Sequence, residues 1–467
     1  MTYDGNTLIQ MGYKPGKHFP EMLQVANGLA EHDIGQEQIR EALDEIYDEA
    51  TFEEPTIPLK ESGKFSVYLD EGTTEYEKNN NTAVMEHVKE LVRVPTIVDA
   101  AVMPDACPAG SAMGTIPVGC VAVAENAIHP GMHSADICCS MYLTVLDIEG
   151  TPENAKTVLD SVQKVSHFGV GGRKEYPLGH HHYIVDQAHN NPFLASVRMF
   201  KAMSEHHATQ GDGNHFFFVG KLESTGQLTL VTHHGSRKPG ALLYKDGMRV
   251  AELYRQKLSP DTPKHNAWIP FDTEDGQNYW EALQIIREWT KYNHTTIHNE
   301  VMLDAFGIRD YVDRFWNEHN FVFKQGTKFY HAKGSTPVFG NHAHDADPNG
   351  RTIIPLNMGE DILIVKDHPN NEFGFAPHGA GRYMSRTQYM KTKAGKTVEQ
   401  LMKEEVGHID ARFYTGKPDM SELPGAYKNA KSVENQIQQY QLATVYDRVN
   451  PLGSMMAGEV DKPWRKK

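Results

Sequence analysis

The sequence has few cysteines and no long apolar run. Four cysteines occur in 467 residues, at positions 107, 120, 138 and 139, and none has the C-x-x-C spacing of a structural zinc site. The adjacent pair Cys138 and Cys139 is a poor candidate for a disulfide, so we expect a reducing, cytoplasmic environment with free thiols. No apolar stretch reaches the roughly 18 residues of a membrane-spanning helix, and the N-terminus lacks the features of a signal peptide. We therefore expect no membrane association.

Basic residues are fewer than acidic ones. Lys and Arg number 46 against 61 Asp and Glu, which gives a formal net charge of −15. This balance excludes a general affinity for nucleic acids but leaves room for a local basic groove. Histidine is abundant by contrast, with 25 copies, and imidazoles suit both metal binding and acid–base chemistry. The shares of hydrophobic residues (39%) and charged residues (23%) are typical of a folded globular protein.

Hydrophobic periodicity predicts an α/β protein that begins with a helical segment. Apolar residues recur every three or four positions in 19–30, 36–50 and 83–92, which predicts helices within the first 95 residues. After residue 95, strand patterns alternate with helical ones and no clear linker interrupts them, so we expect one large domain. Its predicted helices lie at 152–165, 193–206, 240–258, 278–303, from about 383, and at 433–449; its predicted strands lie at 116–123, 137–146, 215–220, 227–232, 321–324, 328–331 and 361–366.

Side chains that can bind metals gather at the ends of the predicted strands. Asp136 and Cys139 lie three positions apart at the start of one strand, and His215, His233 and His319 stand at the ends of others. Strand ends and the loops after them are where α/β folds place active sites. One carboxylate, one thiolate and three imidazoles suit two divalent ions that share a bridging ligand. Taken singly, the cysteine could equally be a buried apolar residue, and each histidine an ordinary one.

The stretch His378–Arg386 combines a candidate anion site with a candidate nucleophile. Gly379 and Gly381 bracket a sharp turn before a predicted helix, which lets backbone N–H groups approach a phosphate. Arg382 and Arg386 are four positions apart, so on a helix they would project to one side and clamp a phosphate. A histidine beside such a site can act as a base, an acid or a nucleophile toward phosphorus. The chain has no P-loop motif, so a nucleotide would be held in another way.

These stretches resemble, in order, the motifs of the RtcB family of RNA ligases over about residues 100–455. The matching stretches are Met103-Pro104-Asp105, Asp136-Ile137-Cys138-Cys139-Ser140-Met141, Gly213-Asn214-His215-Phe216, His233-His234-Gly235-Ser236-Arg237, His319-Asn320, Lys333-Gly334-Ser335-Thr336, His378 through Arg386, and Ala426-Tyr427-Lys428. The resemblance implies a catalytic domain of central mixed sheets flanked by helices over residues 96–455. A helical extension would precede it over 1–95, and a basic tail would follow over 456–467.

The resemblance also implies an activity and a set of site residues. Members of the family join RNA 3′-phosphate or 2′,3′-cyclic-phosphate ends to 5′-hydroxyl ends, with GTP and two manganese ions. It implies that His378 takes GMP from GTP as a covalent adduct and that Cys139 bridges the ions. The other implied ion ligands are Asp136, His215, His233 and His319. The implied nucleotide-binding residues are Asn214, Asn357, Met358, Gly359, His378, Gly379, Ala380, Gly381, Arg382 and Tyr427.

The chain departs from the family pattern around the nucleotide. Cys138 and Ser140 replace two glycines of the motif that holds Cys139. Phe218 replaces a glutamate of the nucleotide site, and Asn357 replaces a serine of the nucleotide loop. The terminal Lys-Gly of most members is also missing from this chain. These changes predict intact ion ligands together with altered recognition of the base.

Three functions are compatible with these patterns. The leading one is a manganese- and GTP-dependent RNA ligase of RNA repair or tRNA splicing, which leaves room for an archease-type activating partner. The second is a dinuclear metal-dependent phosphoesterase that opens RNA 2′,3′-cyclic phosphates without ligation. The third is a binding protein that senses broken RNA ends, although a pure binder has no need for all five ion ligands together with His378. Covalent labelling of the protein by a nucleotide separates the first function from the other two.

Overall fold

The computed structural model describes residues 2–32, 34–51, 56–173, 182–339 and 347–459. The chain divides into two compact units, Met1–Ile57 and Pro58–Lys467. The sequence pattern predicts a boundary after residue 95 instead. The predicted helix at 83–92 belongs to the larger unit, because α4 (Glu75–Leu91) packs on strand β2 (Ile97–Cys107) through Val84, Val88 and Leu91. Of the tail predicted at 456–467, Met456 ends a strand that begins at Thr444, and residues 460–467 lie outside the described part of the chain.

The described residues of the N-terminal unit form three helices: α1 (Gly5–Gln10), α2 (Phe19–Glu31) and α3 (Gln36–Thr51). The periodicity predicted α2 and α3, and both are confirmed. The first helix was not predicted; Asp4 caps its N-terminus, because the Asp4 side chain accepts a hydrogen bond from the backbone N–H of Thr7. The unit has a small apolar core of its own, formed by Tyr3, Leu8, Tyr13, Met22, Ala26, Ile39 and Leu43.

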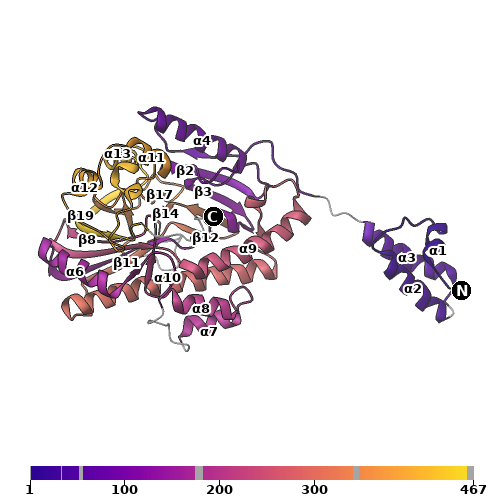
Figure 1. Ribbon diagram of the computed structural model, residues 1–467. Coiled ribbons are helices and arrows are strands. Elements are labelled where there is room, and N and C mark those ends of the chain that lie inside the picture. Colours follow the sequence, from indigo (N-terminus) through magenta and orange to yellow (C-terminus); the bar gives the residue numbers. More distant parts are fainter. Residues whose placement is uncertain (1, 33, 52–55, 174–181, 340–346, 460–467) are drawn as a thin grey trace. The chain divides into compact units, whose positions relative to one another are not determined.

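Two β-sheets form the centre of the larger unit (Figure 1). The five-stranded sheet has the order β1-β2-β3-β13-β12, with β1 (Ser66–Val67), β3 (Val118–Glu125), β13 (Lys328–Lys333) and β12 (Asn320–Gln325) beside β2. The second sheet has the order β11-β5-β9-β8-β19-β16-β15, with β18 (Asp410–Phe413) paired to β19. Its strands are β11 (Asp313–Glu318), β5 (Ser140–Glu149), β9 (Gln227–His234), β8 (Phe216–Leu222), β19 (Thr444–Met456), β16 (Ile362–Lys366) and β15 (Arg351–Pro355). The predicted mixed α/β fold is confirmed.

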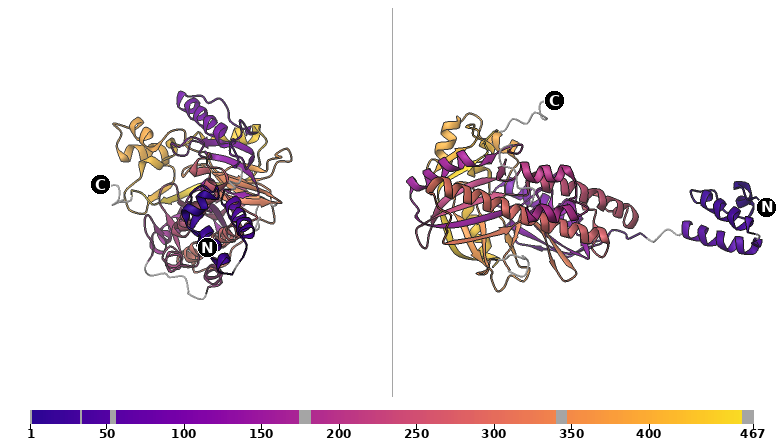
Figure 2. Two further views of the ribbon diagram at one scale, coloured as in Figure 1. Left: turned by 90° about the vertical axis from the view of Figure 1, so that its right-hand side faces the viewer. Right: turned by 90° about the horizontal axis from the view of Figure 1, so that it is seen from below.

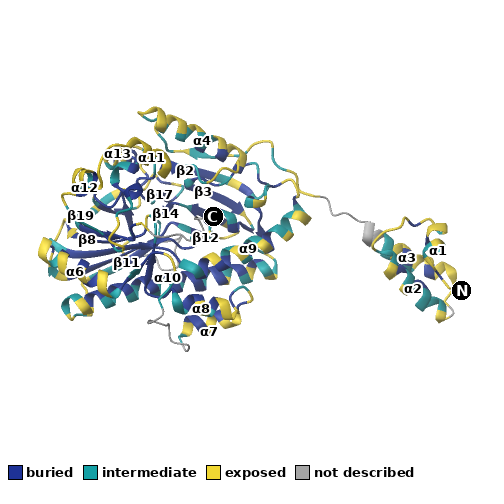
Figure 3. Cartoon of the chain, in the orientation of Figure 1, coloured by how far each residue is buried: buried dark blue, intermediate teal, exposed yellow. Residues whose placement is uncertain are grey.

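Helices cover the faces of these sheets, which leaves the strands buried (Figures 2 and 3). Helices α6 (Pro152–Val165) and α10 (Glu274–Phe306) share one apolar core with strands β5, β8 and β9. On the opposite face of the same strands, Met141, Phe216 and Val231 pack with α12 (Val398–Val406). The remaining helices are α5 (Pro130–His133), α7 (Tyr183–Asn190), α8 (Val197–Glu205), α9 (Arg237–Leu258), α11 (Arg386–Thr392) and α13 (Ala430–Gln439). None of the described helices has the length and apolarity needed to cross a membrane.

Two predicted helices near the C-terminus differ from the structure. The helix predicted at 433–449 ends at Gln439, and residues from Thr444 onward form strand β19. Gln441 adopts a left-handed φ of 54°, which ends the helix, and the β-branched residues that follow pair with β16 and β8. The helix predicted from about Tyr383 begins only at Arg386, where Ser385 caps it.

Several histidines are buried in the larger unit as neutral, hydrogen-bonded groups. His129 lies within hydrogen-bond distance of Thr96 Oγ1 and of the Asn266 carbonyl, at 2.8 and 2.9 Å. His133 Nε2 lies 3.0 Å from the Tyr279 hydroxyl. Burial lowers the pKa of His129 to about 3 and that of His133 to about 4, against an ordinary value of 6.5. These histidines therefore stay unprotonated in the folded state at neutral and mildly acidic pH.

We expect the larger unit to lose stability steeply as the pH falls below 6.5. The unfolded chain binds protons at His129 and His133 near pH 6.5, whereas the folded state does not, so acid favours the unfolded chain. Each histidine contributes half of about 1.4 kcal/mol per pH unit at pH 6.5 and nearly the full amount below pH 5.5, so the pair should cost about 3 kcal/mol of unfolding free energy between pH 6.5 and pH 5. Urea unfolding followed by tryptophan fluorescence measures this, because all five tryptophans lie after residue 57. His129→Gln should reduce the pH slope, and a slope in this variant equal to that of the unaltered protein would contradict the prediction.

Candidate active site

Three buried ligand-type side chains meet at one end of strands β5, β8 and β9. Cys139 directly precedes β5, His215 directly precedes β8, and His233 lies in β9 opposite Met141 and Phe216. The antiparallel register of these neighbouring strands brings the three residues together. The Cys139 Sγ atom lies 3.2 Å from His233 Nε2 and 3.5 Å from His215 Nε2. The three potential ligand atoms all lie within 4.8 Å of one another.

Asp136 and His319 extend this cluster. His215 Nε2 lies 3.3 Å from Asp136 Oδ2, and His233 Nε2 lies 3.1 Å from His319 Nε2. His319 is the single residue between β11 and β12, at the junction of the two large sheets. Gly235 allows the close approach of Asp136, because a Cβ at that position would lie only 2.1 Å from Asp136 Oδ1. All five residues predicted as ion ligands are therefore brought together.

The chemistry of this cluster fits a divalent transition metal. Burial lowers the pKa of His233 to about 3 and holds the pKa of His319 well below its ordinary value. Burial raises the pKa of the Cys139 thiol, and the neighbouring Asp136 raises it further. Burial acts to raise the pKa of Asp136 as well, but the contact with His215 outweighs it and lowers that pKa. Unprotonated imidazoles facing a thiol and a carboxylate are a donor set for a cation that would stabilise the thiolate.

His378 lies beside the cluster and is oriented by a buried carboxylate. It follows β17 (Phe375–Pro377), and its ring centroid lies 4.9 Å from that of His319. Its Nδ1 atom lies 2.6 Å from Asp105 Oδ2, and its backbone N–H donates to the same oxygen at 3.1 Å. Asp105 is fully buried. The Lys428 Nζ atom holds the chain around this carboxylate, since it donates to the carbonyls of Pro104 and Ala106.

The pairing of Asp105 with His378 could not be predicted from the sequence pattern. The only sequence signal is a carboxylate inside the stretch Met103-Pro104-Asp105, 273 positions away from its partner. Gly381 also contributes to the arrangement. Its φ of 70° is left-handed, and a Cβ there would lie 2.0 Å from the Asp105 carbonyl oxygen. A glycine is therefore required at this point of closest approach.

A cavity of about 190 Å³ opens next to His378 and His233. Nine of the ten predicted nucleotide-binding residues line it: Asn214, Asn357, Met358, His378, Gly379, Ala380, Gly381, Arg382 and Tyr427. The tenth, Gly359, is not in the lining, but its backbone N–H donates to Asn357 Oδ1 at 3.0 Å and so fixes that side chain. Phe218 is fully buried in the apolar core and does not line the cavity. Its position offers no polar contact to a nucleotide.

The two arginines of the predicted phosphate clamp converge on a carboxylate. Arg382 precedes helix α11, so the two arginines do not share a helix face as predicted. Both nevertheless contact Glu422: Arg382 Nη1 at 3.3 Å and Arg386 Nε at 2.6 Å. Tyr427 donates its hydroxyl to Glu422 at 2.6 Å. Glu422 is buried at the cavity wall, and nothing in the sequence pattern drew attention to it.

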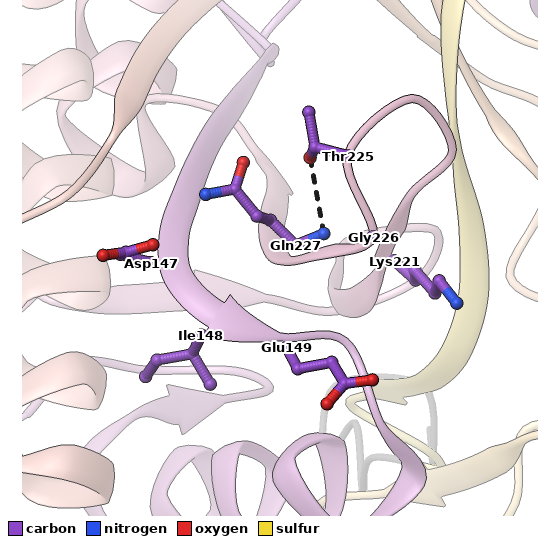
Figure 4. A pocket seen from close by; sticks show the side chains of 7 residues that line it. All are labelled: Asp147, Ile148, Glu149, Lys221, Thr225, Gly226 and Gln227. Carbon is purple, nitrogen blue, oxygen red and sulfur yellow. Dashed lines mark hydrogen bonds between the residues drawn. The ribbon is translucent and has the colours of Figure 1, made fainter.

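A second cavity, of about 360 Å³, lies at the opposite end of the same strands (Figure 4). It is lined by Asp147, Ile148 and Glu149 of β5, by Lys221 of β8, by the turn residues Thr225 and Gly226, and by Gln227 at the start of β9. None of the predicted site residues lies in it. The chemistry described above is therefore confined to the end of the sheet where Cys139 lies.

Sequence similarity relates this chain to one protein family. The sequence profile of the RtcB family, described as tRNA-splicing ligase RtcB, matches residues 87–457. A tRNA-splicing ligase RtcB of Aeropyrum pernix is 26% identical over 288 residues, which cover 54% of this chain and 59% of that protein. The Pyrococcus horikoshii protein of the same name is 26% identical over 282 residues, covering 52% of this chain and 32% of that protein.

A longer alignment is found with the tRNA-splicing ligase RtcB of Thermococcus kodakarensis. It is 23% identical over 458 residues and covers 83% of this chain and 93% of that protein. The aligned segments thus span about a third to nine tenths of these relatives. Since the family profile matches most of the larger unit, including every residue of the cluster and the cavity described above, the chain belongs to the RtcB family.

Proposed function

We propose that the protein is an RNA ligase that joins 3′-phosphate or 2′,3′-cyclic-phosphate ends to 5′-hydroxyl ends through a covalent His378–GMP intermediate. The observation that carries the proposal is the position of His378, held by Asp105 between the ligand cluster and the cavity. Membership of a family of tRNA-splicing ligases supports RNA as the substrate. RNA repair or tRNA splicing is the corresponding role, with an archease-type protein as a candidate activator.

The hydrogen bond to Asp105 prepares His378 for attack on phosphorus. Asp105 accepts the Nδ1–H, which leaves the lone pair of the imidazole on Nε2. In the proposed first step, Nε2 attacks the α-phosphorus of GTP, a P–N bond forms, the bond to the β-phosphate oxygen breaks, and pyrophosphate leaves. A 2′,3′-cyclic phosphate end is first opened by water, which breaks the bond between phosphorus and the 2′-oxygen and leaves a 3′-phosphate. An oxygen of the RNA 3′-phosphate then attacks the phosphorus of the adduct, and the P–N bond to the histidine breaks. Finally, the 5′-hydroxyl of the second RNA end attacks the 3′-phosphate, and GMP leaves.

The other residues of the site would bind the phosphates of the nucleotide and the RNA. Two manganese ions, held by Asp136, Cys139, His215, His233 and His319, would neutralise phosphate oxygens. Arg382 and Arg386 place two positive charges against the single negative charge of Glu422, so this wall of the cavity keeps a net positive charge. The Arg386 side chain contacts Glu422 and is also 54% exposed, so it can bind a phosphate at the cavity mouth as well. The cavity thereby attracts anions in spite of the acidic chain as a whole.

Ligation and adduct formation can be tested together. Purified protein is incubated with manganese, each labelled nucleoside triphosphate, and two RNA strands that carry a 2′,3′-cyclic phosphate and a 5′-hydroxyl. We expect a joined RNA and, without RNA, a protein that carries one nucleotide at His378 in intact-mass and peptide analysis. Opening of the cyclic phosphate with no adduct and no joining would identify a phosphoesterase instead. Binding of RNA ends with no chemistry would identify a sensor.

We expect a weaker preference for GTP over ATP than in a family member that keeps the glutamate at the position of Phe218. Discrimination between bases depends on buried polar groups that the wrong base leaves unpaired. Phe218 lies in the core and offers no such group, and the Glu422 carboxylate is already bound by Arg382, Arg386 and Tyr427. Adduct formation with GTP should therefore be faster than with ATP by less than about tenfold. Rates measured side by side at equal manganese test this; selectivity of a thousandfold would show that other residues recognise guanine.

A further inference from the structure

Three histidines with no role in the proposed chemistry lie directly behind the ligand cluster. His234 in β9 and His294 and His298 in α10 are fully buried. Along β9, His233 faces the cluster, so the neighbouring Thr232 and His234 face the opposite side, toward α10. The His234 and His294 rings stack with their centroids 3.5 Å apart. The same strands thus carry ligand residues on one face and a polar cluster on the other.

The polar atoms on this second face form an unbroken row of hydrogen bonds, which we call the relay. Ser140 Oγ lies 3.0 Å from His294 Nε2, and Thr232 Oγ1 lies 2.7 Å from His294 Nδ1. Thr232 Oγ1 also lies 2.9 Å from His298 Nε2. The row ends in a contact of 2.9 Å between His298 Nδ1 and Thr144 Oγ1, which accepts Nε–H of Arg314 at 3.0 Å. The relay consists of Ser140, His294, Thr232, His298, Thr144 and Arg314.

The two ends of the relay fix the direction of every bond in it. Ser140 Oγ also lies 3.0 Å from the Cys138 carbonyl and 3.3 Å from the His234 carbonyl, and since carbonyls only accept, its single proton points to one of them. His294 must then donate Nε2–H to Ser140 and accept the Thr232 proton at Nδ1. His298 in turn donates Nε2–H to Thr232 and accepts at Nδ1. Burial holds the pKa values of both histidines well below their ordinary value, so each is neutral and carries one ring proton.

The opposite direction leaves a proton without an acceptor. In that case Ser140 would donate its only proton to His294. The carbonyl oxygens of Cys138 and His234 would then face the Ser140 oxygen with no proton between them. At the far end, His298 would donate to Thr144, which already accepts from Arg314, and no other acceptor for the Thr144 hydroxyl is found among the described residues. The first direction satisfies every group. The relay is therefore a single polarised row that runs from Arg314 to the backbone of Cys138.

The end of the relay lies at a strained turn. Cys138 has a left-handed φ of 57°, a conformation that is strained for a non-glycine residue. This turn immediately precedes Cys139 and sets the direction in which its thiol points. The Ser140 hydroxyl donates to the Cys138 carbonyl across the turn, and the same hydroxyl accepts a hydrogen bond from His294. In this chain, a hydroxyl anchored from the other face of the sheet supports a turn that a glycine would adopt without strain.

We propose that the relay positions Cys139 for metal binding, with Ser140 as the positioning residue that carries its effect through the sheet. The inference rests on the proposed metal site. Substitution of a residue that orients a metal ligand through a hydrogen bond commonly weakens metal affinity by about 10- to 100-fold. We expect an effect of about this size for the relay residues. The relay residues touch neither nucleotide nor RNA in this proposal. Their effect should therefore appear in metal binding itself, before any ligation chemistry.

Cobalt binding tests the relay without reference to activity. The full-length protein is titrated with Co²⁺ alone, and the thiolate-to-cobalt charge-transfer absorption reports both the affinity and the geometry at Cys139. Ser140→Ala and Thr232→Val remove one hydroxyl each and should weaken Co²⁺ binding about tenfold or more and shift the absorption band. Ser140→Thr keeps the hydroxyl and should retain most of the affinity. The matched control is Ser454→Ala, because Ser454 is equally buried and its hydroxyl has no hydrogen-bond partner among the described residues.

The outcomes separate the relay from the metal site. If Ser140→Ala and Thr232→Val equal Ser454→Ala in cobalt affinity and in their spectra, that result would contradict the positioning role of the relay and leave the proposed metal site intact. A titration in which the unaltered protein shows no thiolate band would overturn the metal site, and the relay with it. Should Ser140→Ala fail to fold, Thr144→Val breaks the row at its far end and should weaken Co²⁺ binding in the same direction. An unchanged spectrum in that folded variant would count against the relay.

Discussion

Replacing His378 with alanine is expected to abolish the covalent nucleotide adduct, and replacing Asp105 with asparagine to slow its formation by about 10³- to 10⁴-fold. The first change removes the attacking nitrogen. The second keeps the size of the side chain, but an amide nitrogen can donate to Nδ1, which would move the ring proton to Nε2 and remove the attacking lone pair. Loss of an orienting carboxylate in a comparable histidine pair costs up to about 10⁴-fold. Intact-mass measurement with manganese and GTP follows the adduct over time.

The comparison of these two variants distinguishes an orienting role from a structural one. Asp105 is buried, so its replacement could disturb the strand that carries it. Melting of Asp105→Asn close to that of the unaltered protein, with the adduct slowed, supports the orienting role. Co²⁺ binding should also be retained, since Asp105 is not among the ligand residues. Adduct formation at the normal rate in Asp105→Asn, or an adduct on another residue in His378→Ala, would contradict the proposed mechanism.

Replacing Cys139 with alanine is expected to lower metal binding and metal-dependent activity by at least about 100-fold, whereas Cys138→Gly should leave both within a few-fold. The Cys139 thiol lies within 3.5 Å of two histidine nitrogens of the cluster, and its loss removes the proposed bridging ligand. Cys138 has its side chain in the core and a left-handed backbone, which glycine adopts without strain. Relief of about 1 kcal/mol of strain should partly offset the small cavity left by the missing side chain.

Metal titration and thermal melting of the two variants give the measurement. Cys139→Ala should melt close to the unaltered metal-free protein and fail to gain stability when metal is added. Cys138→Gly should gain stability with metal as the unaltered protein does. Equal losses of metal binding in both variants would mean that the wrong cysteine was assigned. If both variants only lowered the melting temperature, the pair would be buried core residues without a ligand role.

Much of the site was predictable because its residues lie at strand ends in recognisable short motifs. Asp136, Cys139, His215, His233 and His319 were all expected together, and the structure brings them together. The helices and strands that carry these residues follow hydrophobic periodicity, which is a local property of the chain. The helix predicted at 433–449 ends early because Gln441 has a left-handed backbone, and the helix predicted from about Tyr383 begins later because Ser385 caps it. Hydrophobic periodicity does not report such local features of the backbone.

The tertiary structure alone decided how these residues are oriented and supported. Asp105 meets His378 across 273 positions, and Glu422 gathers Arg382 and Arg386 although it belongs to neither of their motifs. The relay depends on the register that sets Ser140 opposite His234 and on the packing of α10 against that face. The sequence by itself determines which ligand-type and nucleophilic side chains the chain carries and where along the chain they occur. Which buried donor meets which acceptor depends on strand register and helix packing, because these contacts join segments that the chain separates by tens to hundreds of residues.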